Sequence, residues 1–302
     1  MRLIRAELLK ARRRTATWVL LVVALALTAL IYFLIGRSIG GVGCDITIGD
    51  FGQSCIVEFP AAYALIDQFA FTTLGGLLAI VYAAAFVGAD WNWGVLRNVI
   101  ARGESRARYL LAKAAGLSIV LLVGCAIIFF FALAMTFVSA LSQGIPIASP
   151  LRGNGLLDLV TNFALGFVVV LERAALGFAV AVVLRSQLAG AVVGIVLYLG
   201  EGIVTTYLTF SAAARFFGGN GGGIGEGDLQ LIGPEWFQYL PMTVGNQVLS
   251  WAPGVAGNIA AGGIQGIFLR PVPFEQAFPA LLIYLFAAVA VAVVSLNRQE
   301  II

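Results

Sequence analysis

Long apolar segments alternate with polar ones along the whole chain, and this pattern predicts membrane-spanning helices. The first apolar segment covers residues 18–36. At helical rise it spans about 28 Å, close to the hydrocarbon thickness of a bilayer. In all, the predicted crossings cover residues 18–36, 69–88, 114–139, 157–184, 188–208 and 277–296. The sequence therefore predicts an all-α membrane protein with six transmembrane helices, in which residues 1–302 form a single transmembrane domain.

The first fifteen residues combine basic side chains with an apolar stripe. Leu8 lies four residues after Ile4 and five after Leu3, so these side chains share one face of a helix. We predict that residues 1–15 form an interfacial helix whose basic face meets anionic lipid. Its arginines also suit a simpler role, which is to fix the orientation of the first crossing, and the two roles are compatible.

Basic residues are concentrated between alternate crossings, and this bias predicts the orientation of the chain. The segments expected inside contain thirteen Lys or Arg residues, whereas those expected outside contain four. The positive-inside rule then places both termini in the cytoplasm. We expect a multi-pass protein of the bacterial cytoplasmic membrane.

Residues 86–113 form a basic interruption between the second and third crossings. Its charged residues are Asp90, Arg97, Arg102, Glu104, Arg106, Arg108 and Lys113. Because the charge bias puts this stretch in the cytoplasm, we predict that it is a coupling region where a soluble partner docks.

Two polar segments are expected on the outside. Residues 37–68 contain Cys44 and Cys55, which either form a disulfide that stabilises by about 2 to 3 kcal/mol or remain two free thiols. Residues 209–276 form a long extracellular segment. Within it, residues 236–251 are moderately apolar but too short to span, so we expect short helices on, or dipping into, the outer leaflet.

Composition excludes several classes of function. Hydrophobic residues make up 61% of the chain, charged residues 11%, and the mean hydropathy is +0.99, so no soluble domain is expected. A net charge of +3 makes a nucleic-acid partner improbable. The chain has no His and three Cys, which argues against an enzyme and against a structural zinc site. The glycine-rich residues 218–227 lack the Gly-Lys-Ser/Thr ending of a phosphate loop and predict a linker.

Three charged residues fall inside predicted crossings. Glu172 and Glu201 lie at matched depth, roughly 19 Å from the inner surface, and Arg173 follows Glu172 directly. One interpretation is an Arg173–Glu201 ion pair that locks the fourth and fifth crossings together. The others are a site that binds a cationic substrate or relays protons, and a position in the outer headgroup region.

Two motifs resemble those of a known family. One is Arg5-Ala6-Glu7-Leu8-Leu9-Lys10 with its trailing arginines. The other is Asp90-Trp91-Asn92-Trp93-Gly94-Val95-Leu96-Arg97-Asn98, followed by Gly103-Glu104-Ser105-Arg106 and Lys113. Together with the topology, they resemble the permease subunits of ABC-2 type transporters. Asp90 is in the place of the acidic residue that usually opens the second motif, and Val95 replaces a frequent Thr.

The resemblance implies a fold like that of type V ABC exporters and a non-enzymatic transport subunit. Two permeases, either identical or homologous, would face each other in the membrane lipid. Two ATPase subunits, which carry the ATP and Mg, would dock below, so this chain needs no cofactor. The residues implied in ATPase coupling are Asp90, Trp93, Gly94, Leu96, Arg97, Arg102, Arg106 and Arg108. The alternatives are a proton-coupled secondary transporter that uses Glu172 and Glu201, a membrane scaffold, and an intramembrane enzyme.

Overall fold

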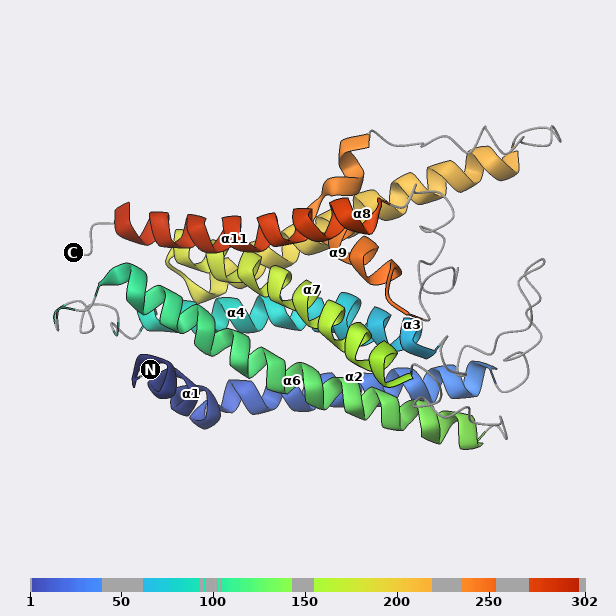
Figure 1. Cartoon of the computed structure of the whole chain (residues 1–302), viewed down its shortest axis with the longest axis horizontal. Coiled ribbons are helices and arrows are strands. Elements are labelled where there is room, and N and C mark those ends of the chain that lie inside the picture. Colours follow the sequence, from blue (N-terminus) through green and yellow to red (C-terminus); the bar gives the residue numbers. More distant parts are fainter. Residues whose placement is uncertain are drawn as a thin grey trace.

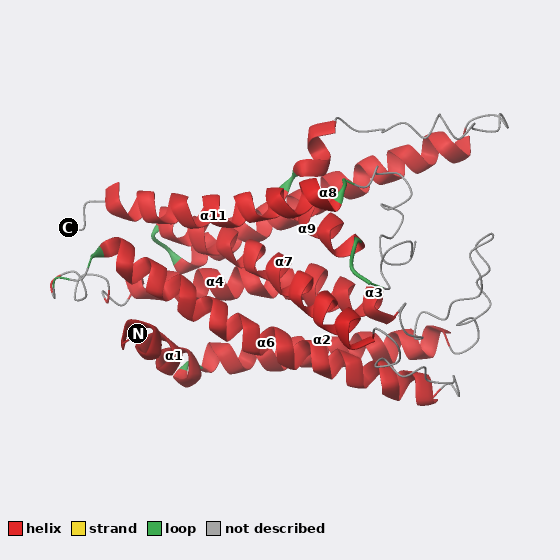
Figure 2. Cartoon of the chain, in the orientation of Figure 1, coloured by secondary structure: helices red, strands yellow, loops and turns green. Residues whose placement is uncertain are grey.

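A computed structural model of the chain describes residues 2–39, 62–92, 105–142, 155–218, 235–253 and 272–298, together with residues 95, 101 and 103. Its elements are α1 (Arg2–Arg13), α2 (Thr15–Ile39), α3 (Ala62–Asp67), the π-helix η1 (Gln68–Thr73), α4 (Leu74–Asn92), α6 (Arg106–Ser142), α7 (Gly155–Leu184), α8 (Gln187–Gly218), the 3-10 helix η2 (Glu235–Tyr239), α9 (Pro241–Ser250) and α11 (Phe274–Arg298). The described part is helical and contains no strand (Figure 2).

Six helices are long and apolar enough to cross a membrane. They cover residues 15–34, 65–91, 106–142, 155–184, 187–208 and 274–298. Each contains or closely overlaps one predicted crossing, so the prediction of six membrane-spanning helices is confirmed. The chain is a multi-pass membrane protein.

The long helices run side by side along the molecule, with the two chain termini at the same end (Figure 1). α7 is central and packs against α4, α8 and α11. α1 and α2 pack against α6 on the flank. The second and fourth spans are mostly buried, whereas the others present most of their surface outward. That exposed surface is apolar, as expected of helices in contact with lipid.

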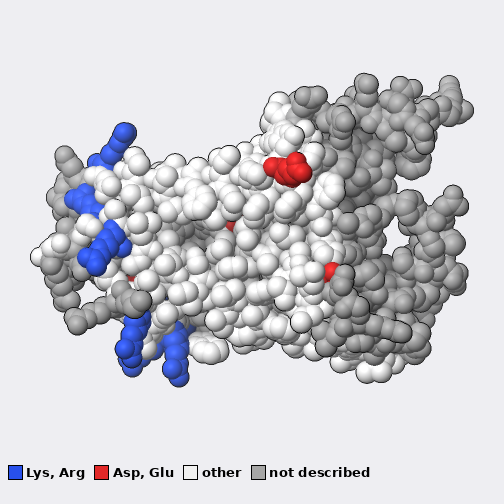
Figure 3. Space-filling view, in the orientation of Figure 1, with Lys and Arg blue, Asp and Glu red and all other residues white. Residues whose placement is uncertain are grey.

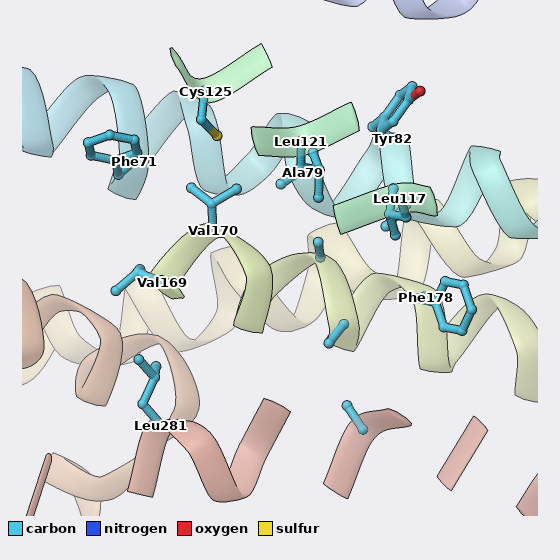
Figure 4. Close-up of a cluster of buried hydrophobic side chains, with 14 of the residues drawn as sticks. Phe71, Ala79, Tyr82, Leu117, Leu121, Cys125, Val169, Val170, Phe178 and Leu281 are labelled. Carbon is cyan, nitrogen blue, oxygen red and sulfur yellow. The ribbon is translucent and has the colours of Figure 1, made fainter. Parts of the chain in front are cut away.

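Small residues bring α4 and α7 close together. A Cβ atom added at Gly177 would lie 2.6 Å from the carbonyl oxygen of Ile80, and one added at Gly166 would overlap the ring of Phe71. The expectation that small residues in the fourth crossing permit close packing is therefore confirmed. Around this contact the core is filled by side chains such as Phe71, Val170 and Phe178 (Figure 4).

The polar stretch expected at 86–113 is shorter in the structure. α4 continues to Asn92 and α6 begins at Arg106, so both ends of the stretch are helical. Asp90 and Lys113 are buried at 1% and 0% exposure. These helices extend beyond the predicted crossings because their polar side chains pair with each other and not with water.

The turn between α7 and α8 lies where the sequence predicted it, at residues 185–187. Arg185 has a φ of 53°, a left-handed conformation that commonly ends a helix and that usually belongs to glycine. Ser186 then starts α8, because its Oγ accepts a hydrogen bond of 3.3 Å from the backbone N–H of Ala189.

Short helices are present in the segment 236–251, as expected. Trp236 and Tyr239 of η2 are exposed, whereas most of α9 is buried and packs against α7, α8 and α11. α9 therefore does not lie flat on the surface, because three of its polar side chains have partners within the bundle. Cys44 and Cys55 lie outside the described residues. Cys125 is a free, buried thiol in α6.

Lys and Arg side chains gather at one end of the molecule, whereas the described middle shows only isolated acidic side chains and no Lys or Arg on the face in Figure 3. We call this the basic end. It contains both described termini, the C-terminal end of α4, the N-terminal end of α6 and the α7–α8 turn (Figure 1). The opposite end is called the far end.

Candidate functional site

A buried group of charges joins three helices at the basic end. Lys113 on α6 donates a hydrogen bond of 3.2 Å to Oε2 of Glu7 on α1 and another to Oδ2 of Asp90 on α4. The hydroxyl of Tyr109 also donates to Asp90. We call Glu7, Asp90, Tyr109 and Lys113 the Lys113 cluster. All four side chains are buried.

Further basic and aromatic side chains surround the Lys113 cluster. The Nζ of Lys10 lies 2.7 Å from Oε1 of Glu7, and Nη2 of Arg14 lies 3.7 Å from Oδ1 of Asp90. The ring of Phe86 lies 5.0 Å from the Lys113 ammonium and 5.7 Å from the Arg14 guanidinium. Each carboxylate therefore faces two cations, and the aromatic ring contributes a further attraction to Lys113 and Arg14.

The spacing of residues explains how the Lys113 cluster forms. Tyr109 and Lys113 are four residues apart and share one face of α6. On α1, Glu7 and Ala11 share the face that packs against α6. A Cβ atom at Gly116 would lie 3.2 Å from the Cβ of Glu7, so the glycine lets α1 approach closely.

Two expectations bear on this packing. Asp90, which the resemblance implies in ATPase coupling, is buried and bound to Lys113 and Tyr109. α1 turns Glu7 and Ala11 toward the protein, while Leu3, Ile4 and Leu8 are half-buried. The contact of residues 1–15 with lipid stays a prediction.

The other residues implied in coupling divide into two groups. Arg106 is half-buried and donates a hydrogen bond of 3.2 Å to the carbonyl of Leu296 near the end of α11. Arg108 is exposed, and its backbone N–H donates to Oγ of Ser105, which caps α6. The remaining five, Trp93, Gly94, Leu96, Arg97 and Arg102, lie outside the described residues.

The second polar site surrounds Arg173 in the middle of α7. Its Nη1 donates to the carbonyls of Phe71 and Thr72 on η1, the first at 3.0 Å. In η1 the N–H of Leu74 bonds to the carbonyl of Phe69, five residues earlier. Arg173 therefore binds two backbone carbonyls of this π-helix.

Two adjacent glycines make this arrangement possible. A Cβ atom at Gly75 would lie 1.7 Å from the carbonyl oxygen of Ala70, so the π-helix requires glycine there. A Cβ atom at Gly76 would lie 2.5 Å from Nη1 of Arg173, so glycine also gives the guanidinium its space.

Side chains from α8 and α9 complete the Arg173 site. Nη2 of Arg173 donates to Oδ1 of Asn246 on α9 at 2.8 Å. The ring of Tyr198 on α8 lies 5.6 Å from the guanidinium, and its hydroxyl donates to the carbonyl of Thr72 at 2.6 Å. We call Arg173, Tyr198, Asn246 and the η1 carbonyls the Arg173 cluster. It joins the π-helix, α7, α8 and α9.

Glu201 does not pair with Arg173, so that prediction is wrong. Among the described residues no ion pair joins them. Oε1 of Glu201 instead accepts hydrogen bonds from the backbone N–H and the Oγ1 of Thr243, at 2.7 and 2.9 Å. Thr243 is in the first turn of α9, so the carboxylate caps a helix N-terminus, where a negative charge is favourable.

Glu172 has a different environment from its neighbour Arg173. Its side chain is 0% exposed, and neither carboxylate oxygen has a hydrogen-bond partner among the described residues. A buried neutral polar group without a hydrogen-bond partner costs on the order of 2 to 7 kcal/mol by transfer scales, and an ionised carboxylate costs far more. Glu172 is therefore a costly residue whose position no structural contact explains.

Sequence reasoning missed Tyr109, Tyr198, Thr243 and Asn246, and it named Glu7 only as part of a motif, without its partner. Two signals pointed to their neighbourhood. The pair Gly75-Gly76 interrupts a predicted crossing, and the polar residues of 243–247 have helical spacing within a moderately apolar segment.

The two clusters hold helices together: the Lys113 cluster joins α1, α4 and α6, and the Arg173 cluster joins η1, α7, α8 and α9. In the described part of the chain, no group of three or more Cys, Asp or Glu residues could hold a metal ion. Comparison of the chain with models of protein families gives no match, and comparison with curated proteins gives none either.

Proposed function

We propose that the chain is the permease subunit of an ATP-driven exporter, with a separate ATPase that docks at the basic end. The observation that carries this proposal is the Lys113 cluster. It ties α1 to α4 and α6, the helices on either side of the basic connection. Motion imposed on this end by a soluble partner would then move the three helices together.

The charge distribution supports the same proposal. The buried carboxylates Glu7 and Asp90 are paired with Lys113, Lys10 and Arg14. Arg108 and Arg13 are exposed at this end. A partner with an acidic surface would be attracted here, and the positive-inside rule favours the cytoplasm for this end.

The proposed assembly contains two permeases and two ATPase subunits in the cytoplasmic membrane of a bacterium. The twofold arrangement rests on the resemblance to ABC-2 permeases. Exposed apolar side chains of α8, including Leu188, Val196 and Ile203, provide surface that lipid or a second permease could cover.

Copurification tests the proposal. The tagged chain is solubilised from its source membrane, and bound ATPase is identified and measured. Charge reversal at Arg106 and Arg108, extended to Arg97 and Arg102, should release the ATPase. Arg185→Glu makes the same charge change at the α7–α8 turn and should retain it. If no ATPase copurifies, or if export persists in vesicles without ATP, the proposal fails.

A second candidate function is proton-coupled secondary transport, and Glu172 is the observation that favours it. A carboxyl group without partners in the middle of a crossing is suited to bind and release a proton. In this case Glu172→Gln would abolish transport driven by a pH gradient. Under the leading proposal, ATP-driven transport continues in this variant.

A further inference from the structure

A groove of about 270 Å³ lies on the flank of the bundle between α1, α2, α4 and α6. Its walls are apolar and include Leu21 of α2, Leu78 of α4 and Leu121 of α6, and Val170 of α7 also lines it. Figure 4 shows Leu121 and Cys125 of α6 facing Ala79 and Val170.

The apolar walls of the groove offer no hydrogen-bonding group, because the hydroxyl groups nearby bond to each other. Oγ1 of Thr17 and the hydroxyl of Tyr82 lie 3.2 Å apart and bond to each other. Other lining side chains, such as Trp18, Ile119 and Val123, are exposed and apolar. The occupant that fits this lining is a hydrocarbon.

The dimensions of the groove match a single acyl chain. Its α6 wall runs from Ile119 to Ile128, which is about 14 Å at helical rise. This is close to half of a hydrocarbon core of about 30 Å, that is, to the depth of one leaflet. A cavity of about 150 Å³ already accommodates benzene, so this groove has space for a longer chain segment.

One end of the groove carries a positive charge. Arg12 lines it, and its backbone carbonyl accepts a hydrogen bond of 2.9 Å from Nε1 of Trp18. The Arg12 side chain is exposed and has no ion-pair partner among the described residues. The carboxylates at this end, Glu7 and Asp90, are bound to Lys113. The charge on Arg12 therefore remains available to an external phosphate.

We propose that the groove binds one acyl chain of an anionic phospholipid, with the phosphate of that lipid on Arg12. A hydrocarbon site one leaflet deep, with a free cation at its headgroup end, complements this lipid in shape and in charge. Lipid binding in the groove is independent of any ATPase partner.

Gly124 provides a specific way to block the groove. It lines the groove, and a Cβ atom added there meets no atom within 4 Å. Gly124→Leu should therefore fill the groove without disturbing the fold. Gly202 on α8 is also open, lies outside the groove and gives the matched control Gly202→Leu.

The test uses the full chain in detergent with phosphatidylglycerol that carries a photoactivatable acyl chain, and phosphatidylcholine with the same chain for comparison. We expect phosphatidylglycerol to label residues 119–128 preferentially. Gly124→Leu should abolish this labelling, and Gly202→Leu should preserve it. Arg12→Gln should lower the preference for phosphatidylglycerol about fivefold, the effect of about 1 kcal/mol from one basic residue.

Three outcomes would overturn the proposal. Labelling spread evenly over the exposed faces of α6 and α8 would show that the groove is not a specific site. Equal labelling of the wild-type protein by the two lipids would show that Arg12 does not select the anionic lipid. Absence of labelling, with a change of oligomeric state in Gly124→Leu, would identify the groove as a contact between protein chains.

Discussion

The ammonium group of Lys113 on α6 lies 3.2 Å from Oε2 of Glu7 on α1, and both side chains are buried. The two residues are 106 positions apart in the sequence. Their contact fixes the N-terminal helix to the third crossing, and the bond from Lys113 to Asp90 adds the second crossing. This lysine therefore contributes directly to the orientation of α1.

Replacement of Lys113 by Met should destabilise the protein by about 3 to 5 kcal/mol, because two buried carboxylates lose their shared cation. Lys10→Met is the matched control, since Lys10 also pairs with Glu7 but its side chain is 39% exposed. We expect it to cost less than about 1 kcal/mol. The stability of both variants is measured in detergent by unfolding them with heat or denaturant. Equal losses of stability would contradict the importance given to burial.

The Arg173 cluster makes a prediction about coupling between residues. In a double-mutant cycle, Arg173→Lys and Asn246→Ala should show a coupling energy of about 1.5 to 3 kcal/mol, because the guanidinium donates directly to the amide oxygen. Arg173→Lys and Glu201→Gln should couple weakly, because Glu201 bonds to Thr243.

Exchanging the charges of Arg173 and Glu201 gives a second test of whether these two residues pair. The double variant with Arg173→Glu and Glu201→Arg should be no more stable than the single variants. Rescue by this exchange would show that the two residues pair after all.

Glu172→Gln should leave the free energy of unfolding nearly unchanged, because it replaces a carboxyl group that has no hydrogen-bond partner among the described residues with an amide of the same shape. Asn162 is a useful comparison. Its Nδ2 donates to the carbonyls of Asp158 and Pro253, so Asn162→Leu should destabilise. A clear loss of stability in Glu172→Gln would mean that the carboxyl group has a partner in the folded protein.

Arg185→Gly should stabilise the protein by about 1 kcal/mol, because a left-handed conformation is unfavourable for a residue with a Cβ atom. Arg185→Ala retains the Cβ atom and serves as the control, with little expected gain. Thermal unfolding of the two variants side by side would detect the difference. A greater gain from alanine than from glycine would exclude this explanation.

The six crossings could be predicted from the sequence because a bilayer imposes a minimum apolar length. The positions of the helix ends could not. Asp90 and Lys113 look like loop residues when each is considered alone, and only their pairing makes them compatible with buried helix ends. A contact between residues 23 positions apart leaves no local pattern in the sequence.

The interior of the candidate site was predicted less well, for two physical reasons. Matched depth placed Glu201 near Arg173, but depth does not determine which hydrogen-bond donors compete for a carboxylate, and the N-terminus of α9 was the competitor. The π-helix was also missed, because a single extra residue in a helix hardly alters an apolar pattern. In the sequence, the adjacent glycines Gly75 and Gly76 were the feature that indicated it.

The π-helix has a consequence for how the second crossing can move. Relative to a regular α-helix it accommodates one additional residue, which turns everything beyond it by about 100°. Asp67 lies just before the π-helix and is 2% exposed, and Asp90 lies beyond it and binds Lys113. Deletion of one residue between Gln68 and Thr73 would therefore change the rotation of Asp67 relative to Asp90. The second crossing thus consists of two segments in different rotational register, and the guanidinium of Arg173 donates hydrogen bonds to the π-helix that joins them.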